Sequence, residues 1–414
     1  MSASPDTVRP GIRPFTGEVH VIGAGPVGLM LTALLQPIEG MKLHLYEKRS
    51  EYTRKRMVQL APYLVADSIE AYETDAIDGD SIGALFDPAE LVDGLAFRRT
   101  IPPDLAGLLH EWSLGFCALN EIEQSLSELI DARTEHPVAR TTGLVTAEEA
   151  IDRLDPGGIL IDCTGSGSIL RDHLTTGADD VEAHLEGVRV RLEYALVITF
   201  LYGQPYDCNE SCKYYKNVGN LQYKFIPMVR RTHYDGSVTH VTGIVTITPE
   251  EFAEMPPRCD GEWLRENFPV VAESMDRFID KIREETHGDL IGDLEIIRIP
   301  LNVYRARNAT NRRWLRSGRT DHPFAHAPVF LAGDSAIGSP YFQSISLGFE
   351  CAMRLAELIA RPGLPLDDLL DEYELFMYKQ WLRVYMRSKM IKHNKDLFEA
   401  IDDPVRLLEK LHIY

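Results

Sequence analysis

The sequence predicts an α/β protein in which a nucleotide-binding domain with a parallel sheet is interrupted by a β-rich domain and followed by helices. Three observations predict this. Residues 18–47 contain a strand, a glycine-rich turn, a helix and a second strand; strand-like stretches dominate residues 187–248; and residues 366–414 are helical in pattern. We therefore expect a discontinuous first domain over 15–180 and 300–362, a β-rich substrate domain over 181–299 and a helical segment over 363–414.

The composition is typical of a soluble globular protein. The chain has 414 residues, of which 44% are hydrophobic and 26% charged, and 63 acidic against 43 basic residues give a net charge of -20. So acidic a surface repels phosphate backbones and argues against nucleic-acid binding. No apolar run approaches the roughly 20 residues that cross a bilayer. The polar start and six scattered cysteines favour a reduced, cytoplasmic protein without a metal site.

The first domain is predicted from its N-terminal elements. The β-branched run 18–22 is a strand, 29–35 has the length of an apolar helix, and 42–46 is a second strand. Short apolar runs predict further strands at 158–162, 189–201, 238–248 and 329–332, and periodicity predicts helices at 115–132 and 346–360.

The turn after the first strand carries the strongest functional signal. Gly23, Gly25 and Gly28 are spaced as Gly-x-Gly-x-x-Gly, with Pro26 and Val27 between the last two. The first glycine permits the tight turn, the second lets a pyrophosphate approach, and the third lets helix and strand pack closely. Glu47 ends the second strand, where a carboxylate accepts hydrogen bonds from ribose hydroxyls. Together these features predict a Rossmann-type site for an adenine dinucleotide.

Four segments of the chain resemble FAD-dependent monooxygenases of the group A, aromatic-hydroxylase type. Besides the glycine turn, Val-Phe-Leu-Ala-Gly333-Asp334-Ser-Ala-Ile-Gly-Ser-Pro340 resembles the Gly-Asp segment of that family. The resemblance implies that the Asp binds the ribityl chain of FAD and that the following helix points its N-terminus at the flavin. It also implies an FAD-binding domain of the glutathione reductase type.

The other two segments follow the second and third predicted strands. Asp-Cys-Thr164-Gly165-Ser-Gly-Ser-Ile-Leu-Arg resembles the family's Asp-Gly segment, with Thr164 replacing the usual acid. The stretch Tyr-Glu-Lys48-Arg-Ser-Glu-Tyr-Thr-Arg54-Lys-Arg56 looks like that of kynurenine 3-monooxygenase and the MICAL-type monooxygenase domains. There the resemblance implies that an Arg approaches the flavin.

Two segments depart from the family pattern. Where the family usually has an Arg or Gln that touches FAD, this sequence offers Asn120, with Gln124 one turn on. The loop after Pro340 is normally glycine-rich, whereas here it contains Ser344 and Ser346, small residues that let the backbone approach the flavin.

The resemblance implies a reaction. NAD(P)H, visiting transiently, would reduce FAD, and O2 would form a C4a-hydroperoxyflavin that hydroxylates or epoxidises an aromatic or natural-product molecule. The same fold leaves a halogenase, a reductase or an oxidase open, and also a flavin-binding scaffold without activity. Against halogenation, the chain has no Trp-x-Trp-x-Ile-Pro segment.

The sequence is less informative about substrate and partners. No catalytic residue is identified, and aromatic candidates for the substrate pocket are Tyr202, Tyr215, Tyr223, Phe225 and Tyr341. Two stretches are basic and free of acidic residues. Residues 304–319 could receive NADPH phosphates or a charged substrate, and residues 379–395 could dock an acidic carrier protein or a membrane surface. Either stretch could instead be solvated surface. The oligomeric state, monomer or dimer, stays open.

Overall fold

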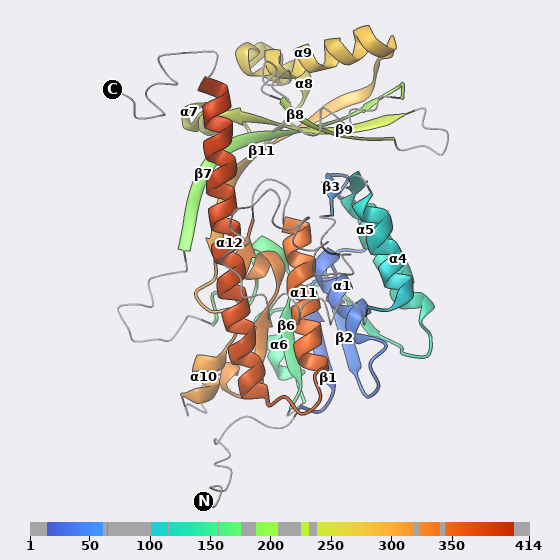
Figure 1. Cartoon of the computed structure of the whole chain (residues 1–414), viewed down its shortest axis with the longest axis vertical. Coiled ribbons are helices and arrows are strands. Elements are labelled where there is room, and N and C mark those ends of the chain that lie inside the picture. The colour runs from blue at the N-terminus through green and yellow to red at the C-terminus, as the bar shows by residue number, and fades with distance from the viewer. Residues whose placement is uncertain are drawn as a thin grey trace, which may run out of the picture.

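The structure is a computed structural model, and it describes residues 15–60, 64, 101–114, 116–155, 157–174, 188–205, 225–231, 238–317, 323–339 and 344–400. These residues form a parallel sheet with its helices and, beside it, an antiparallel sheet with helices on its outer face (Figure 1). The long helix α12 (Leu366–Ala400) runs along both parts.

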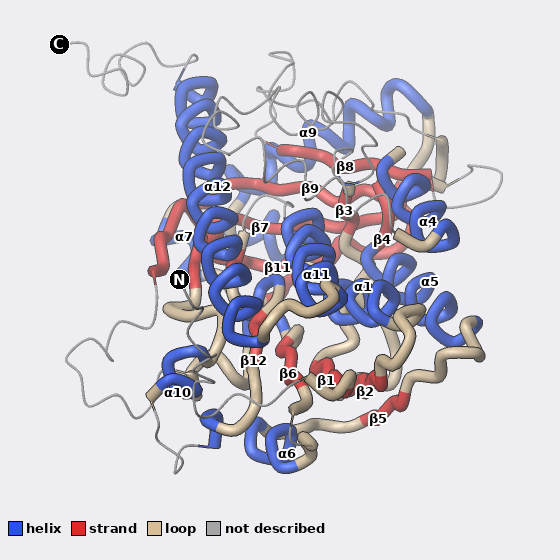
Figure 2. The backbone as a smooth tube through the Cα atoms, turned by 60° about the horizontal axis from the view of Figure 1, so that its bottom comes forward, coloured by secondary structure: helices blue, strands red, loops and turns tan. Residues whose placement is uncertain are grey.

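The first sheet has five parallel strands in the order β12-β6-β1-β2-β5. They lie side by side in one layer (Figure 2). The strands are β1 (Glu18–Ile22), β2 (Lys42–Glu47), β5 (Ala139–Thr142), β6 (Ile159–Asp162) and β12 (Val329–Leu331). Strand order places the late strand β12 next to β6, so the Gly333 segment joins the N-terminal unit. The predicted strands at 18–22, 42–46, 158–162 and 329–332 are confirmed.

The core of this part lies between the sheet and its helices. Helix α1 (Pro26–Leu35) is buried from Gly28 onward and packs against α11 (Ser344–Ala360) and α5 (Leu119–Ala132). These helices share one apolar cluster with Val19, Val21 and the strands beside them. Helices α4 (Pro103–Ser113) and α6 (Ala147–Asp152) complete the first part.

The prediction of one helix over 115–132 is wrong at its start. Residues Phe116–Ala118 form strand β4, which pairs antiparallel with β3 (Met57–Gln59), and α5 begins only at Leu119. Periodicity does not separate the two elements, because Phe116 lies three residues before Leu119 and so continues the apolar repeat of α5.

The second sheet is antiparallel, in the order β10-β11-β7-β9-β8, with β13 beside β11. Its strands are β7 (Val188–Tyr202), β8 (Phe225–Arg231), β9 (Thr239–Ile247), β10 (Arg258–Cys259), β11 (Leu290–Arg305) and β13 (Ile337–Gly338). The predicted strands 189–201 and 238–248 are confirmed. Helices α7 (Pro249–Glu254), α8 (Gly261–Asn267) and α9 (Pro269–Thr286) follow β9, and α8 and α9 bury an apolar cluster against the sheet. The expected domain boundary at 299/300 falls inside β11.

Helix α12 is tied to the first part at several points. The Tyr373 hydroxyl donates to the carbonyl of Leu331 at 3.0 Å, and Arg383 forms an ion pair with the buried Glu350 of α11. In the basic stretch 304–319, Arg316 of α10 (Arg312–Arg316) pairs with Asp367 and Asp371. Part of the positive charge of the basic stretch 304–319 is therefore neutralised by acidic residues of α12. Among the described residues, no helix combines the length and apolarity that a membrane crossing requires.

Candidate cofactor site

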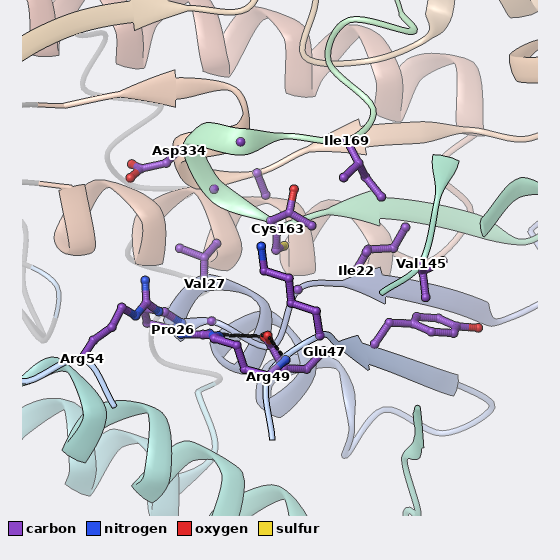
Figure 3. A pocket seen from close by; sticks show the side chains of 18 of the residues that line it. Ile22, Pro26, Val27, Glu47, Arg49, Arg54, Val145, Cys163, Ile169 and Asp334 are labelled. Atoms are coloured by element: carbon purple, nitrogen blue, oxygen red, sulfur yellow. Dashed lines mark hydrogen bonds and ion pairs between the residues drawn. The ribbon is translucent and has the colours of Figure 1, made fainter. Parts of the chain in front are cut away.

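A cavity of about 370 Å³ opens where the parallel strands end and α1 begins (Figure 3). Ligand pockets commonly have about 300–1,000 Å³. Its walls come from segments far apart in the sequence: the β1 turn, the end of β2, the turn after β6, the turn after β12 and the start of α11. Twelve predicted site residues line it: Gly23, Gly25, Pro26, Val27, Glu47, Lys48, Arg54, Arg56, Thr164, Gly165, Asp334 and Ser344.

The glycine turn fits the roles that its spacing predicts. Gly23 has a φ of 96°, and a Cβ there would lie 2.7 Å from the carbonyl oxygen of Cys163. A Cβ on Gly28 would lie 2.0 Å from the carbonyl oxygen of Gly23. Gly25 is different, because a Cβ there would meet its nearest neighbour, Arg54 Nη2, only at 3.4 Å. Gly23 and Gly28 are thus needed by the fold, whereas Gly25 lines the cavity and a Cβ there would have only ordinary contacts.

Two helices present their N-termini to the cavity. Gly25 is the N-cap of α1 and Pro26 follows it, and no side chain caps the first turn. Unpaired N–H groups at a helix start carry partial positive charge and bind phosphate oxygens. Ser344 and Ile345, at the start of the 17-residue α11, line the same cavity. The cavity therefore has two electropositive ends.

Glu47 is held by an arginine that the sequence reading did not single out. Arg49 donates to Glu47 Oε1 from its backbone N and its Nε, both at 3.0 Å, and to Oε2 from Nη2 at 3.3 Å. Burial alone would raise the pKa of Glu47, but the hydrogen bonds from Arg49 outweigh it and hold the pKa below its ordinary value. Glu47 is therefore an ionised acceptor.

A second missed residue, Glu123, is fully buried on α5 beneath the arginines. Arg54 forms an ion pair with Glu123, and Arg49 Nη2 lies 3.4 Å from Glu123 Oε1. Glu123 is four residues after Leu119 and three before Leu126, so the helical period does place it on the buried face. That position was the signal that could have identified it. Glu123 thus anchors two cations at the cavity wall.

Asp334 and Arg56 bring opposite charges to the far side of the cavity. Burial raises the pKa of Asp334 to about 6, although the positive charges of Arg56 and Arg54 partly offset this. Within the described part of the chain, no donor is bonded to the Asp334 carboxylate. Tyr304 of β11 donates its hydroxyl to the backbone carbonyl of Asp334. Asp334 is therefore fixed through its backbone and keeps its carboxylate available.

The turn after β6 is organised by Asp162. Its buried carboxylate accepts from Thr164 N at 2.8 Å, Thr164 Oγ1 at 2.6 Å, Ser168 Oγ at 2.6 Å and Leu170 N at 3.0 Å. Arg171 donates from Nη1 to the carbonyl of Ser335 at 3.2 Å, which joins this turn to the Asp334 turn. Asp162 therefore shapes the loop that brings Thr164 and Gly165 to the cavity.

Several predicted residues lie near the cavity without lining it. Gly28, Gly333 and Ser346 are buried behind the wall, and Gly333 (φ 63°) leaves room for Val27, whose Cγ2 would lie 2.9 Å from an added Cβ. Asn120, at the start of α5, donates its backbone N–H to the carbonyl of Arg54. Gln124 donates to Glu128 at 2.7 Å and lines a neighbouring pocket that shares Glu47 and Arg49 with the cavity.

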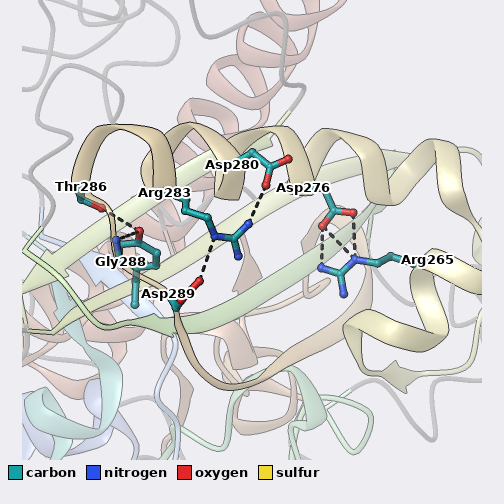
Figure 4. Close-up of polar contacts among 8 residues, drawn as sticks. Arg265, Asp276, Asp280, Arg283, Thr286, Gly288 and Asp289 are labelled. Carbon is teal, nitrogen blue, oxygen red and sulfur yellow. Dashed lines mark hydrogen bonds and ion pairs between the residues drawn. The ribbon is translucent and has the colours of Figure 1, made fainter.

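Most of the substrate-pocket candidates lie outside the residues that the structure describes. Tyr215, Tyr223, Tyr341 and Pro340 lie outside the described residues, as does the side chain of Phe225. For Tyr202 the prediction is wrong. Tyr202 is fully buried between the antiparallel sheet and α9. Its hydroxyl contacts Thr286 Oγ1 at 2.8 Å and the N–H of Gly288 at 3.1 Å. Figure 4 shows Thr286 and Gly288 at the C-terminal end of α9. Tyr202 is a core residue that fixes the end of α9.

The chain has the Rossmann-type fold of FAD-binding flavoproteins, as comparison with solved structures shows. HpxO of Klebsiella pneumoniae, complexed with FAD and uric acid, matches with a TM-score of 0.51 and 16% identity, over 96% of this chain and 92% of HpxO. Tetracycline destructase Tet(51) matches with a TM-score of 0.52 and 11% identity, over 97% of each chain. The Diels-Alderase PyrE3 of pyrroindomycin biosynthesis matches with a TM-score of 0.51 and 15% identity, over 96% of this chain and 77% of PyrE3.

By sequence, neither a family model nor a curated protein matches this chain. The residues of the cavity nevertheless fit FAD. Gly25 lines the cavity at the start of α1, Glu47 is an ionised acceptor, and the Asp334 carboxylate has no hydrogen-bond donor among the described residues. These are the features that a pyrophosphate, a ribose and a polyol chain require.

Proposed function

We propose that the protein is an FAD-dependent monooxygenase that uses NAD(P)H and O2 to hydroxylate or epoxidise an aromatic or natural-product molecule. One observation carries the proposal. Four segments that resemble this class in sequence, around Gly25, Arg54, Thr164 and Asp334, converge on a single cavity. In this proposal residues 15–180 and 300–362 bind FAD, and residues 181–299 bind the substrate.

Each part of the cavity has a role in holding the cofactor. The N-terminus of α1 and the open side of Gly25 would receive the pyrophosphate, and Glu47 would accept from the adenosine ribose. Asp334 would accept from the ribityl hydroxyls. The positive N-terminal end of α11 would stabilise negative charge on the isoalloxazine.

FAD, when bound, supplies the redox and oxygen chemistry, and the protein supplies position and exclusion of water. Arg54 and Arg56 contribute positive charge to the cavity wall, and Glu123 fixes Arg54. HpxO, which has the same fold, is complexed with FAD and uric acid, a heteroaromatic molecule. That complex supports an aromatic substrate for this chain too.

The test combines cofactor, reductant and oxygen. The purified protein, loaded with FAD, is mixed with NADH or NADPH and a panel of aromatic and polyketide-like molecules under ¹⁸O2. We expect NAD(P)H oxidation to be stimulated by one class of molecule and one ¹⁸O atom to enter the product. A product that forms without label from O2 would contradict oxygenation while leaving FAD binding intact.

A different reaction on the same cofactor is the second candidate. Thr164 replaces the acid usual in the monooxygenase segment, and PyrE3, of the same fold, is a Diels-Alderase. A halogenase, a reductase, an oxidase or an inactive flavin scaffold are therefore the alternatives. Turnover that consumes NAD(P)H and substrate but leaves O2 unconsumed would favour a reductase. Hydrogen peroxide equal to the substrate oxidised, with no NAD(P)H consumed, would favour an oxidase.

A further inference from the structure

Three metal-ligating side chains gather on one face of the parallel sheet, outside the cofactor cavity. Glu18 and His20 lie on β1, and His44 lies beside His20 on β2 in the parallel register. The two imidazole rings stack with centroids 4.3 Å apart and an interplanar angle of 9°. The sequence reading missed this cluster, because its members come together only through strand pairing.

The distances suit a small metal ion. Glu18 Oε1 lies 3.0 Å from His20 Nε2 and 3.4 Å from His44 Nε2, and one ligand atom from each residue lies within 4.8 Å of the others. Tetrahedral zinc with bonds of about 2.0 Å separates its ligand atoms by about 3.3 Å. Two of the three separations are close to this value. The two rings are stacked nearly parallel, so the His44 ring must turn out of the stack for both Nε2 atoms to face one ion.

The cluster also has the partner that orients a metal-bound histidine. His20 Nδ1 lies 2.8 Å from the Tyr46 hydroxyl. A metal-bound imidazole donates its other N–H to an oxygen, which fixes the tautomer and the ring orientation. Without an ion, His20 Nε2 donates to Glu18 Oε1 at 3.0 Å, so a metal ion would replace that proton and Nδ1 would then donate to Tyr46.

Of the three candidate ligands, only His44 is substantially exposed to solvent. The His20 side chain is 3% exposed and Glu18 11%, whereas His44 is 33% exposed. An ion can therefore enter beside His44 and keep a water molecule on that side. Arg153 stacks over the Tyr46 ring at 5.5 Å, but the Glu18 carboxylate supplies a negative ligand directly.

We propose that Glu18, His20 and His44 bind one divalent transition-metal ion of the zinc class, with water as the fourth ligand. Two imidazoles and a carboxylate are ligands that Zn²⁺ accepts in proteins. The ion would join β1 to β2 as a structural link. The proposal does not depend on FAD, because none of the three ligands lines the cavity, although Tyr46 lies between the two sites.

The test is a calorimetric titration of the untagged full chain with Zn²⁺ after treatment with a chelator, repeated with Co²⁺ to record its visible spectrum. Wild-type protein should bind one Zn²⁺ and give the absorption of tetrahedral Co²⁺. His44→Ala and Glu18→Gln, both at partly accessible positions, should each weaken binding at least tenfold, and Tyr46→Phe about 10- to 100-fold. His110→Ala, an exposed histidine on α4, is the matched control and should bind as wild type.

Circular dichroism of each variant verifies that it is folded, so that weak binding reports the site. The proposal is overturned if wild-type protein takes up no stoichiometric Zn²⁺. It is also overturned if His44→Ala and Glu18→Gln bind as tightly as wild type, or if His110→Ala loses the ion equally, since the ion would then be held elsewhere.

Discussion

Gly28 lies so close to Gly23 that a Cβ on Gly28 would be 2.0 Å from the Gly23 carbonyl oxygen. The clash is with backbone, which cannot move aside as the end of a side chain can. The start of α1 is therefore fixed against β1 by the absence of a side chain. This contact determines where the N-terminal N–H groups of α1 point, and with them the phosphate-binding end of the cavity.

Gly28→Ala should destabilise the protein because α1 must shift away from the turn. We expect the free energy of unfolding to fall by about 3 kcal/mol, the upper end of overpacking costs. Gly107→Ala is the matched control. It also replaces a helical glycine, inside α4, but a Cβ at Gly107 would have no atom within 4 Å. Urea denaturation should show that variant unchanged or more stable by up to about 1 kcal/mol. Equal stability of both variants would refute the packing argument.

Glu123→Gln should lower stability because it removes the buried anion that holds Arg54 and Arg49. Both arginines are partly exposed and can be solvated, so we expect about 1–2 kcal/mol, less than for a fully buried pair. Glu128→Gln, on the exposed side of the same helix, should change the free energy of unfolding by less than about 0.5 kcal/mol. A loss no larger for Glu123→Gln than for Glu128→Gln would show that the anchor contributes nothing.

Asp334→Asn should alter how the stability of the FAD-free protein depends on pH. Burial raises the pKa of Asp334 from 3.8 to about 6, so the folded state binds its proton more tightly than the unfolded state does. Stability from this group is present below pH 4 and is lost as pH rises through 6. The shift corresponds to about 3 kcal/mol at most. The free energy of unfolding of Asp334→Asn, measured relative to that of wild type at the same pH, should therefore be higher at pH 7 than at pH 4.5. A difference between the two proteins that does not change with pH would contradict this.

The same substitution should weaken FAD binding, because a carboxylate is a stronger acceptor for ribityl hydroxyls than an amide. Loss of hydrogen bonds to a charged group costs about 1.5–3 kcal/mol, or roughly 10- to 100-fold in Kd. Fluorescence titration with FAD at pH 8, where Asp334 is ionised, measures the change. An unaltered Kd would assign Gly333-Asp334 to the turn alone.

Local sequence rules predicted the elements that are made by neighbours in the chain. The strand at 18–22, the glycine turn and the strand at 42–46 follow one another directly, so spacing and residue type sufficed. The cavity residue Asp334 was predicted through its resemblance to a known segment, because nothing in its immediate surroundings brings it near Gly25.

What the sequence could not predict depends on packing between distant segments. Arg49 and Glu123 meet only because α5 lies against the segment after β2. The stacking of His20 on His44 requires the parallel register of β1 and β2. Tyr202 was misassigned because alternation along β7 predicts which residues share a face but not that this face is covered by α9.

The central claim, that the cavity at Gly25 binds FAD, is tested most directly by titrating wild type and Gly25→Val with FAD. A Cβ at Gly25 has ordinary contacts with the protein, and the backbone there is extended, so the variant should still fold. The added methyl groups fill the space of the pyrophosphate. We predict one FAD per wild-type chain and none in Gly25→Val. A wild-type protein that gains no flavin spectrum, or a folded variant with full flavin occupancy, would contradict the account.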